Sequence, residues 1–153
     1  MRGMPPKEAD PRPCSIADTM ELIGERWSIL VVRELLHGVR RFDGIAHNTG
    51  ASRDILTARL RKLERSGILY RERYSDRPVR YEYHLTEAGR ELGDVLMLLV
   101  KWGDRHINQD DPPVVWTHSC GADLVPEVVC AACGKPAREG AHSPHGRGVR
   151  PTS

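Results

Sequence analysis

The sequence lacks long hydrophobic runs and any strong excess of charge of one sign. No apolar segment approaches the roughly 20 residues that a membrane-spanning helix needs, so we expect no membrane association. The opening stretch MRGMPPKEADPRP has no apolar run of the kind found in a secretory signal, which favours a cytoplasmic protein. In that compartment cysteines usually serve as thiols, metal ligands or redox sensors rather than disulfides. The net charge of +2 says little about partners.

Common catalytic patterns are also missing. The seven histidines form no HExxH pair, and no Ser-His-Asp order, phosphate loop or glycine-rich dinucleotide turn is present. We therefore expect a protein that is not an enzyme. A thiol- or metal-dependent redox protein is the weakest alternative, and metal-assisted catalysis would need an open position on the metal.

The sequence does contain a local concentration of positive charge. Between residues 53 and 80 there are nine Lys or Arg against four Asp or Glu, which is the kind of patch that binds phosphates. Residues 40–85 are predicted to form a short helix, a turn, a basic helix, and two strands joined by a loop at residues 75–78. This order is typical of a winged helix, mainly α with a small β wing, and it points to DNA binding.

The basic helix, predicted near residues 52–65, has one apolar and one polar face. Leu56, Leu60 and Leu63 recur with the 3.6-residue period of a helix, and Ser52 is its predicted N-cap. The opposite face carries Asp54, Ala58, Arg61, Lys62 and Arg65. A helix of this kind suits the major groove, which is wide enough to admit it.

A long apolar helix is predicted from Thr86 to about His106, and its apolar surface is too wide for one small domain to cover. We therefore expect a homodimer. The predicted interface residues are Leu92, Leu96, Leu99 and Trp102. By these patterns the chain divides into a flexible arm (1–13), a winged-helix and dimerisation domain (14–107), a zinc-knuckle-like segment (114–138) and a disordered tail (139–153).

Several motifs occur together and in order: CSIADTMELIGERWSILVVRELLHGVRRFDGI, then LTARLRKLERSGIL, then RYEYHLTEAGREL. They resemble the HxlR-type winged-helix transcriptional regulators of bacteria, which are MarR-like, over about residues 14–106. The resemblance implies a homodimer that binds a palindromic operator. It also implies a repressor or activator, and we expect a repressor. Family members answer to varied signals, so the resemblance does not supply the effector.

The predicted DNA contacts lie on the basic helix, before the preceding helix and on the wing. Early residues of a recognition helix usually reach base edges, and Arg61 could pair bidentately with a guanine. Wing arginines are expected to position the protein on phosphates. The predicted contact residues are Arg40, Arg41, Ser52, Arg53, Asp54, Thr57, Ala58, Arg61, Lys62, Arg73, Arg77 and Arg80. The alternative is a solvated amphipathic helix and hairpin without a DNA role.

A cluster of histidine and cysteine follows the linker at residues 110–113. His118-x-Cys120 and Cys130-x-x-Cys133 offer one imidazole and three thiols, and Cys-x-x-Cys before Gly134 resembles a zinc knuckle. We predict a zinc site from these four ligands, which would be structural because it is closed.

Other readings of the cluster stay open. The spacing of His118 and Cys120 is short for a ligand pair, and His142 or His145 could replace His118. A disulfide from Cys120 to one of the other two cysteines, or simple free thiols, are the alternatives to zinc.

Cys14 stands at the predicted start of the first helix, where the positive end of the helix dipole favours negative charge. The resemblance implies that a cysteine here can sense oxidants or electrophiles, and the alternative is a half-buried small apolar residue. A small-molecule effector in the dimer cleft is the other route to control. A winged helix acting only as a protein–protein module is the alternative to a DNA-binding regulator.

Overall fold

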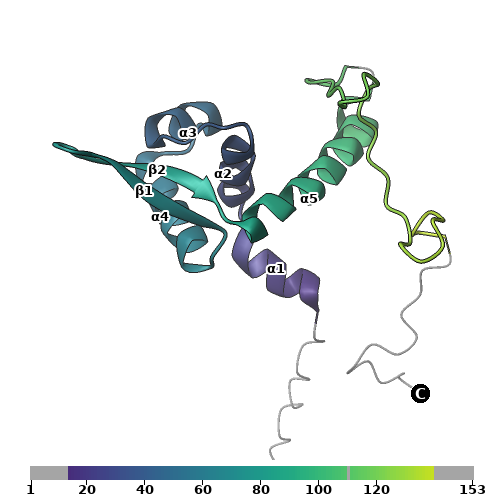
Figure 1. The fold of residues 1–153 in the computed structure, drawn as a ribbon, viewed down its shortest axis with the longest axis horizontal. Coiled ribbons are helices and arrows are strands. Elements are labelled where there is room, and N and C mark those ends of the chain that lie inside the picture. The colour runs from purple at the N-terminus through teal and green to yellow at the C-terminus, as the bar shows by residue number, and fades with distance from the viewer. Residues whose placement is uncertain (1–13, 110, 140–153) are drawn as a thin grey trace, which may run out of the picture.

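The computed structural model describes residues 14–109 and 111–139. The predicted N-terminal arm and nearly all of the predicted disordered tail lie outside these ranges. The helices and strands are, in order, α1 (Ser15–Ile23), α2 (Arg26–Leu36), α3 (Phe42–Thr49), α4 (Arg53–Arg65), β1 (Leu69–Asp76), β2 (Val79–Leu85), α5 (Glu87–Gly103) and the π-helix η1 (Asp104–Asn108). Figure 1 shows α2, α3, α4 and the hairpin packed together, with α5 leading away toward the C-terminal segment.

The core lies beneath α4, and α2 runs through it. Val31, Val32, Ile45, Leu56 and Leu63 are fully buried, and Leu69 and Leu85 close the base of the hairpin. α2 packs against α1, α3, α4, α5 and β2. α2 is therefore the central helix of the core, because the apolar residues around it meet neighbours on most sides.

Two predicted helix caps are confirmed. The Ser52 hydroxyl accepts a hydrogen bond from the Ile55 amide at 3.3 Å, and the Thr86 hydroxyl accepts one from Gly89 at 3.2 Å. Each satisfies an amide that the first turn of a helix leaves without a partner. α4 therefore begins one residue after the predicted cap and ends at Arg65 as expected.

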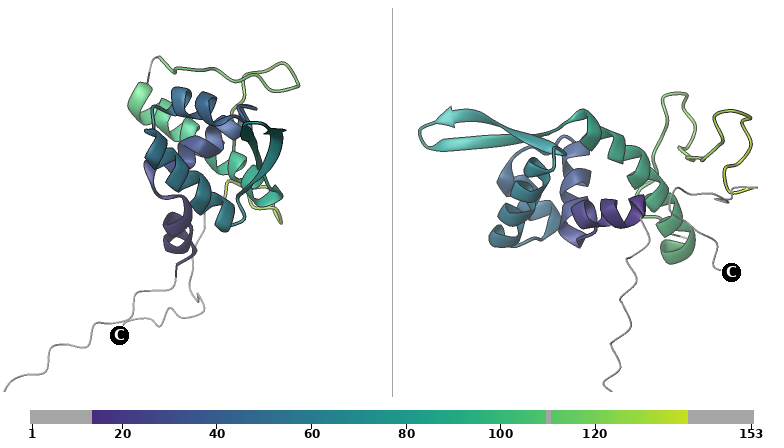
Figure 2. Two further views of the ribbon diagram at one scale, coloured as in Figure 1. Left: turned by 90° about the vertical axis from the view of Figure 1, so that its left-hand side faces the viewer. Right: turned by 90° about the horizontal axis from the view of Figure 1, so that it is seen from below.

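β1 and β2 form an antiparallel hairpin, which we call the wing. Leu69 pairs with Leu85 at its base and Asp76 with Val79 at its tip, with an irregularity between Arg73 and Ser75. β1 thus extends into the predicted loop, and the turn is restricted to residues 77 and 78. Figure 2 shows the wing and the C-terminal segment at opposite ends of the molecule.

The four predicted interface residues of α5 lie in two different surroundings. Leu92 and Leu96 pack against the protein's own core. Leu99 is 55% exposed and Trp102 58% exposed, and Val95 and Leu98 are exposed beside them. A sequence stripe cannot separate these two groups, because α5 leaves the body partway along its length. The α-helix ends at Gly103, short of the predicted His106, and continues as η1.

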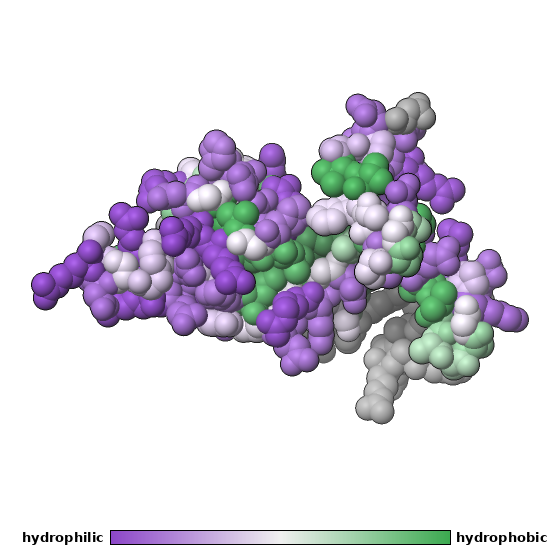
Figure 3. Space-filling view, turned by 45° about the horizontal axis from the view of Figure 1, so that its top comes forward, coloured by the Kyte–Doolittle hydropathy of each residue, from purple (hydrophilic) through white to green (hydrophobic). Residues whose placement is uncertain are grey.

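The C-terminal segment, residues 111–139, has no buried residue. It contains two short antiparallel bridges, Thr117 with Asp123 and Val129 with Pro136. Trp116 meets the His37 ring edge-on at 5.2 Å, and Lys101 Nζ donates to the Pro126 carbonyl at 2.5 Å. Within residues 14–109 and 111–139 no helix is long and apolar enough to span a membrane. In Figure 3 hydrophobic surface gathers between the hydrophilic winged body and this C-terminal part.

Candidate nucleic-acid interface

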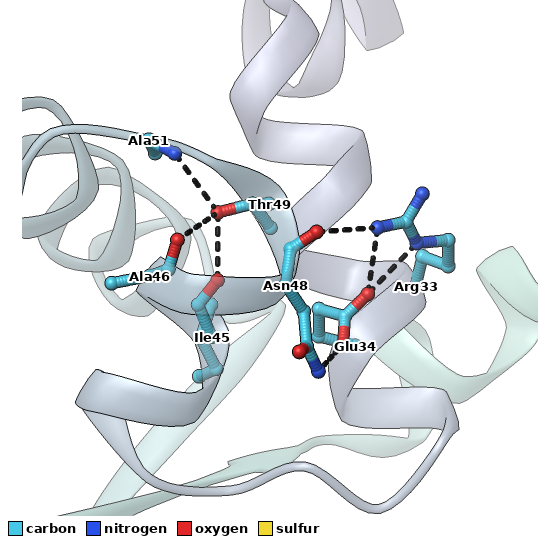
Figure 4. Close-up of polar contacts among 7 residues, drawn as sticks. All are labelled: Arg33, Glu34, Ile45, Ala46, Asn48, Thr49 and Ala51. Atoms are coloured by element: carbon cyan, nitrogen blue, oxygen red, sulfur yellow. Dashed lines mark hydrogen bonds and ion pairs between the residues drawn. The ribbon is translucent and has the colours of Figure 1, made fainter.

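The turn between α3 and α4 is held to α2 by a buried carboxylate (Figure 4). Glu34 is only 4% exposed, and it accepts hydrogen bonds from Asn48 Nδ2 at 2.7 Å and Arg33 Nε at 2.9 Å. A buried charge is tolerated when it is paired and hydrogen-bonded in this way. The Thr49 hydroxyl accepts from the Ala51 amide at 3.3 Å. These contacts fix where α4 begins relative to the core.

Sequence reasoning missed Glu34. The available signal was the single acid of a helix whose other residues are mostly apolar. The turn predicted between the short helix and the basic helix begins at Gly50, which is left-handed at φ 75°, because Asn48 and Thr49 are still the last residues of α3.

The side of α4 opposite its leucines is open to solvent. Asp54, Ala58, Arg61 and Arg65 are all exposed there. This agrees with the predicted polar face except at one position. No ion pair involves Arg61 or Arg65 within the portion of the chain that the structure describes.

Lys62 is the exception, and the prediction that it contacts DNA is not supported by its position. It lies with Arg59 on the side of α4 that faces the start of α2, where both pair with Glu25. Lys62 Nζ is 3.5 Å from the carboxylate, and its side chain is only 30% exposed. One acid thus neutralises part of the charge of two cations. We call Arg59, Lys62 and Glu25 the paired flank.

On its other side α4 borders a cleft beneath the wing, with a volume of about 270 Å³. We call it the wing-side cleft. The polar and charged residues that line this cleft are Arg53, Thr57, Arg61, Glu64, Arg71 and Tyr83. Arg71 Nε is 3.3 Å from Glu64 Oε1, and its guanidinium stacks 4.7 Å from the centre of the Tyr81 ring. The Arg71 side chain is therefore held in place although it is 48% exposed.

Burial and the charges around the cleft shift the pKa of Tyr83. Burial raises the pKa of Tyr83, and the nearby Arg71 and Arg61 guanidinium groups oppose that rise. Glu64 raises it further. The phenol therefore stays protonated at neutral pH and remains a hydrogen-bond donor.

Two other predicted contacts on α4 already have partners. Arg53 Nη1 is 2.9 Å from Asp43 Oδ1, and its guanidinium lies 4.8 Å from the centre of the Phe42 ring. The Thr57 hydroxyl donates to the Arg53 carbonyl at 2.7 Å, so its proton is used within the helix. The Ser52 hydroxyl serves as the helix cap. These residues flank the open face, but their side chains have local roles.

The predicted arginines around the wing differ in the same way. Arg41 pairs with Glu82 at 3.2 Å and lies 4.6 Å from the centre of the Tyr74 ring, and Arg73 pairs with Asp76 at 3.3 Å. Arg40, Arg77 and Arg80 are exposed, and within residues 14–109 and 111–139 they enter no ion pair. Arg77 and Arg80 flank the tip of the wing.

The C-terminal cysteines lie on two turns of similar build. Gly121 N donates to the His118 carbonyl at 2.9 Å, and Gly134 N donates to the Cys130 carbonyl at 2.7 Å. Both glycines have positive φ, 89° and 72°. Glycine adopts a positive φ without strain, because it has no Cβ. The amides of Ala132 and Cys133 lower the pKa of the Cys130 thiol, because they donate to its sulfur.

The structure brings Cys130 and Cys133 together but not all four predicted ligands. Across the described ranges no three His, Cys, Asp or Glu side chains converge as a metal site would require. All four cysteines of the chain, Cys14 included, are free thiols in the structure. Cys14 is half-buried and precedes α1 as its N-cap residue. The alternative ligands at 142 and 145 lie outside the described residues.

The helix–turn–helix of α3 and α4, followed by a two-stranded wing, defines a winged helix-turn-helix protein. A family model described as HxlR-like helix-turn-helix matches residues 22–111. The chain belongs to the HxlR-like helix-turn-helix family. The resemblance predicted from the sequence motifs is thus confirmed.

Individual relatives agree with this assignment. An HTH-type transcriptional regulator of Mycobacterium bovis is 42% identical over 123 residues, which cover 79% of this chain and 78% of that protein. The crystal structure of PA1607, a candidate transcription factor, matches with a TM-score of 0.73 and 30% identity, covering 89% of this chain and 95% of that one. The redox regulator HypR in its oxidised form matches with a TM-score of 0.53 and 32% identity, covering 61% and 97%.

Two of these similarities extend beyond the winged domain. Residues 1–111 make up less than the 79% and 89% of the chain that the mycobacterial regulator and PA1607 match. Both similarities therefore include part of the C-terminal segment.

Proposed function

We propose that this protein is a transcriptional regulator that binds a palindromic operator as a homodimer. The observation that carries the proposal is the open face of α4, where Arg61 and Arg65 are exposed and enter no ion pair in the described structure. α4 enters the major groove, and Arg77 and Arg80 at the wing tip contact the neighbouring backbone. The mycobacterial relative is itself called an HTH-type transcriptional regulator, which supports this function.

The homodimer is supported by the exposed apolar side of α5. Val95, Leu98, Leu99 and Trp102 are each more than a third exposed, and all but Val95 come after Leu92 and Leu96, on the part of α5 that extends away from the core. Leaving these side chains in water is unfavourable, and a second copy would remove them from it. A two-fold axis here holds two α4 helices about 34 Å apart, one turn of B-DNA.

Replacing Leu99 by Asp tests the dimer. We expect sedimentation of the purified variant to show a folded monomer, because a charge in an apolar interface is costly. Circular dichroism should remain that of the parent, since Leu99 lies outside the core. A variant that remains dimeric would show that this side of α5 is not the interface.

DNA binding is tested by footprinting the DNA upstream of this protein's own gene and its neighbours, at low and high salt. We expect two protected half-sites related by a dyad, and an affinity that falls steeply as salt rises. Reporter transcription from the same promoter should rise when the gene is deleted, as expected for a repressor. Failure to bind any duplex in dilute buffer would instead favour a protein–protein module.

Control through Cys14 is the form of signal that we propose. HypR, a structural relative, is named a redox regulator, and Cys14 is half-buried at the start of α1. Oxidation of this thiol would change the packing of α1 against α2 and α4, and so the population of the DNA-binding state. Operator release by a peroxide should be lost in Cys14→Ser. Unchanged release would leave an effector in the dimer cleft as the route to control.

We also propose that the C-terminal segment binds one zinc ion through His118, Cys120, Cys130 and Cys133. Two knuckle-like turns and a Cys130 thiol with a lowered pKa support this, and thiolates with an imidazole suit zinc. The two turns do not converge in the structure. The metal would therefore draw them together and stabilise a segment that has no core of its own.

Metal analysis of a reduced preparation made without chelator tests the zinc site. We expect about one zinc per chain, as in closed four-ligand sites, and loss of the metal in the Cys130→Ser, Cys133→Ser double variant. His118→Ala tests which histidine is the fourth ligand. The variant should lose zinc if His118 binds it, and keep zinc if the histidine at 142 or 145 does. Absence of zinc from the parent protein would refute the site.

A further inference from the structure

The wing-side cleft differs in chemistry from the rest of the candidate interface. The inner face of the wing carries Arg71 and Tyr83 as a cross-strand pair, just beyond the buried Leu69–Leu85 pair. On the other wall α4 presents Arg61 and Glu64. Besides Arg53, which pairs with Asp43, the cleft therefore brings together the guanidinium groups of Arg61 and Arg71 and the Tyr83 phenol, at the boundary between recognition helix and wing.

The donors of the cleft are held in place before any ligand binds. Arg71 is fixed between Glu64 and the Tyr81 ring, and the Tyr83 amide donates to the Arg40 carbonyl at 2.8 Å. Preorganised donors lose little conformational entropy when they bind an anion. A fixed guanidinium and a phenol O–H suit the oxygens of a phosphate group.

Charge in the cleft favours an anion of the size of one phosphodiester. Arg53, Arg61 and Arg71 line the cleft against the single acid Glu64, and of the three Arg53 is already paired with Asp43 outside the cleft. In a winged helix with one element in each groove, the DNA backbone must pass between them, at the place where the cleft lies. The volume of about 270 Å³ leaves room for a phosphate and part of a sugar.

We propose that the wing-side cleft is a phosphodiester site, in which Arg61, Arg71 and the Tyr83 hydroxyl hold one backbone phosphate per half-site. This rests on the proposed DNA-binding function and adds to it. Arg61 then positions the protein rather than reading a guanine, in contrast to the sequence-based expectation. Glu64 limits the affinity of the site, because its carboxylate repels the phosphate while it orients Arg71.

The first test compares Arg71→Gln with the parent on the footprinted operator and on a random duplex. If Arg71→Gln removes a phosphate contact, the affinities for the operator and for the random duplex should fall by a similar factor, about tenfold. The slope of log affinity against log salt concentration should become shallower by about 1. Arg59→Gln on the paired flank is the matched control and should change neither. Glu64→Gln should strengthen binding to both duplexes. A loss confined to the operator would overturn the proposal, since it would indicate base reading.

The second test neutralises single backbone phosphates with methylphosphonates along the operator. For the parent, one phosphate per half-site should cost about tenfold in affinity, of the size of the Arg71→Gln loss. In Arg71→Gln that same neutralisation should cost little more, because both changes remove one contact. Independent losses that multiply would overturn the phosphate site.

The two tests also separate this inference from the proposed function. A parent protein that binds no duplex refutes both. A parent that binds its operator, with Arg71→Gln unaltered in affinity and salt slope, refutes only the cleft. Thermal unfolding of each variant shows whether a loss reflects misfolding, and Tyr83→Phe gives a milder change that keeps the ring.

Discussion

The two flanks of α4 show how differently cations on one helix can be used. Arg59 and Lys62 on the paired flank share the Glu25 carboxylate. Arg61 and Arg71 border the wing-side cleft, where Glu64 is the one acid. The two flanks carry similar residues in the sequence, yet only the cleft side has a cation on α4, Arg61, that enters no ion pair in the described structure. A count of basic residues therefore overestimates the DNA-binding surface.

The largest expected effect comes from the core beneath both flanks. Leu63 is fully buried, so Leu63→Ala should lower the free energy of unfolding by about 2–5 kcal/mol. Urea denaturation measures this, and both flanks should lose their function together as α4 loosens. Ile55→Ala on the same helix is the control, because Ile55 is exposed and should cost about 1 kcal/mol or less. Equal costs would contradict the assigned packing of α4.

Exchanging one cation from each flank tests the comparison directly. Arg61→Ala should weaken operator binding about tenfold, since it removes an exposed charge from the interface. Lys62→Ala should change affinity by less than about threefold, because its charge is already paired and lies on the other flank. Fluorescence anisotropy at one fixed salt concentration gives both values. An equal loss from the two variants would remove the distinction between the flanks.

Releasing the cations of the paired flank should raise DNA affinity rather than lower it. Glu25→Gln frees Arg59 and Lys62, so binding to a random duplex should strengthen by roughly threefold. Stability should change by about 1 kcal/mol or less, as for other exposed ion pairs. Glu21→Gln makes the same charge change on the exposed surface of α1 and serves as the control. No difference between the two variants would show that Glu25 does not restrain the paired flank.

The smallest effect is the pH dependence that Tyr83 gives to stability. Burial raises the pKa of Tyr83 above its ordinary value of 10.0, so the folded protein keeps this proton to higher pH than the unfolded chain does. Its contribution is present below pH 10 or so and is lost as the pH rises through the folded pKa. Tyr83→Phe should therefore lose less stability than the parent as the pH rises above about 10. Tyr74→Phe, at an exposed ring, should follow the parent.

The sequence predicted the parts of the fold that depend on local pattern. The leucine spacing and the Ser52 hydroxyl fixed the boundaries of α4, and Thr86 fixed the start of α5. A helical wheel also gave the open face, because Asp54, Ala58 and Arg61 all point away from the core. These features follow from residues within a few positions of one another.

What the sequence could not predict depends on neighbours that are distant along the chain. Lys62 lies at a polar position of the wheel, but only the fold shows that Glu25 stands beside it. Leu92 and Leu99 belong to one sequence stripe, yet α5 leaves the body between them. Arg71 and Tyr83 become a pair only through the strand register. In the C-terminal segment, glycine and cysteine spacing indicated the turns but not their separation.

The central claim is that two copies of this chain present their α4 helices to one duplex. Sedimentation equilibrium of the complex with the footprinted operator tests this most directly. The account predicts a mass of two chains per duplex, with a half-site duplex bound much more weakly. A saturated complex of one chain per duplex, or no complex at low salt, would contradict it.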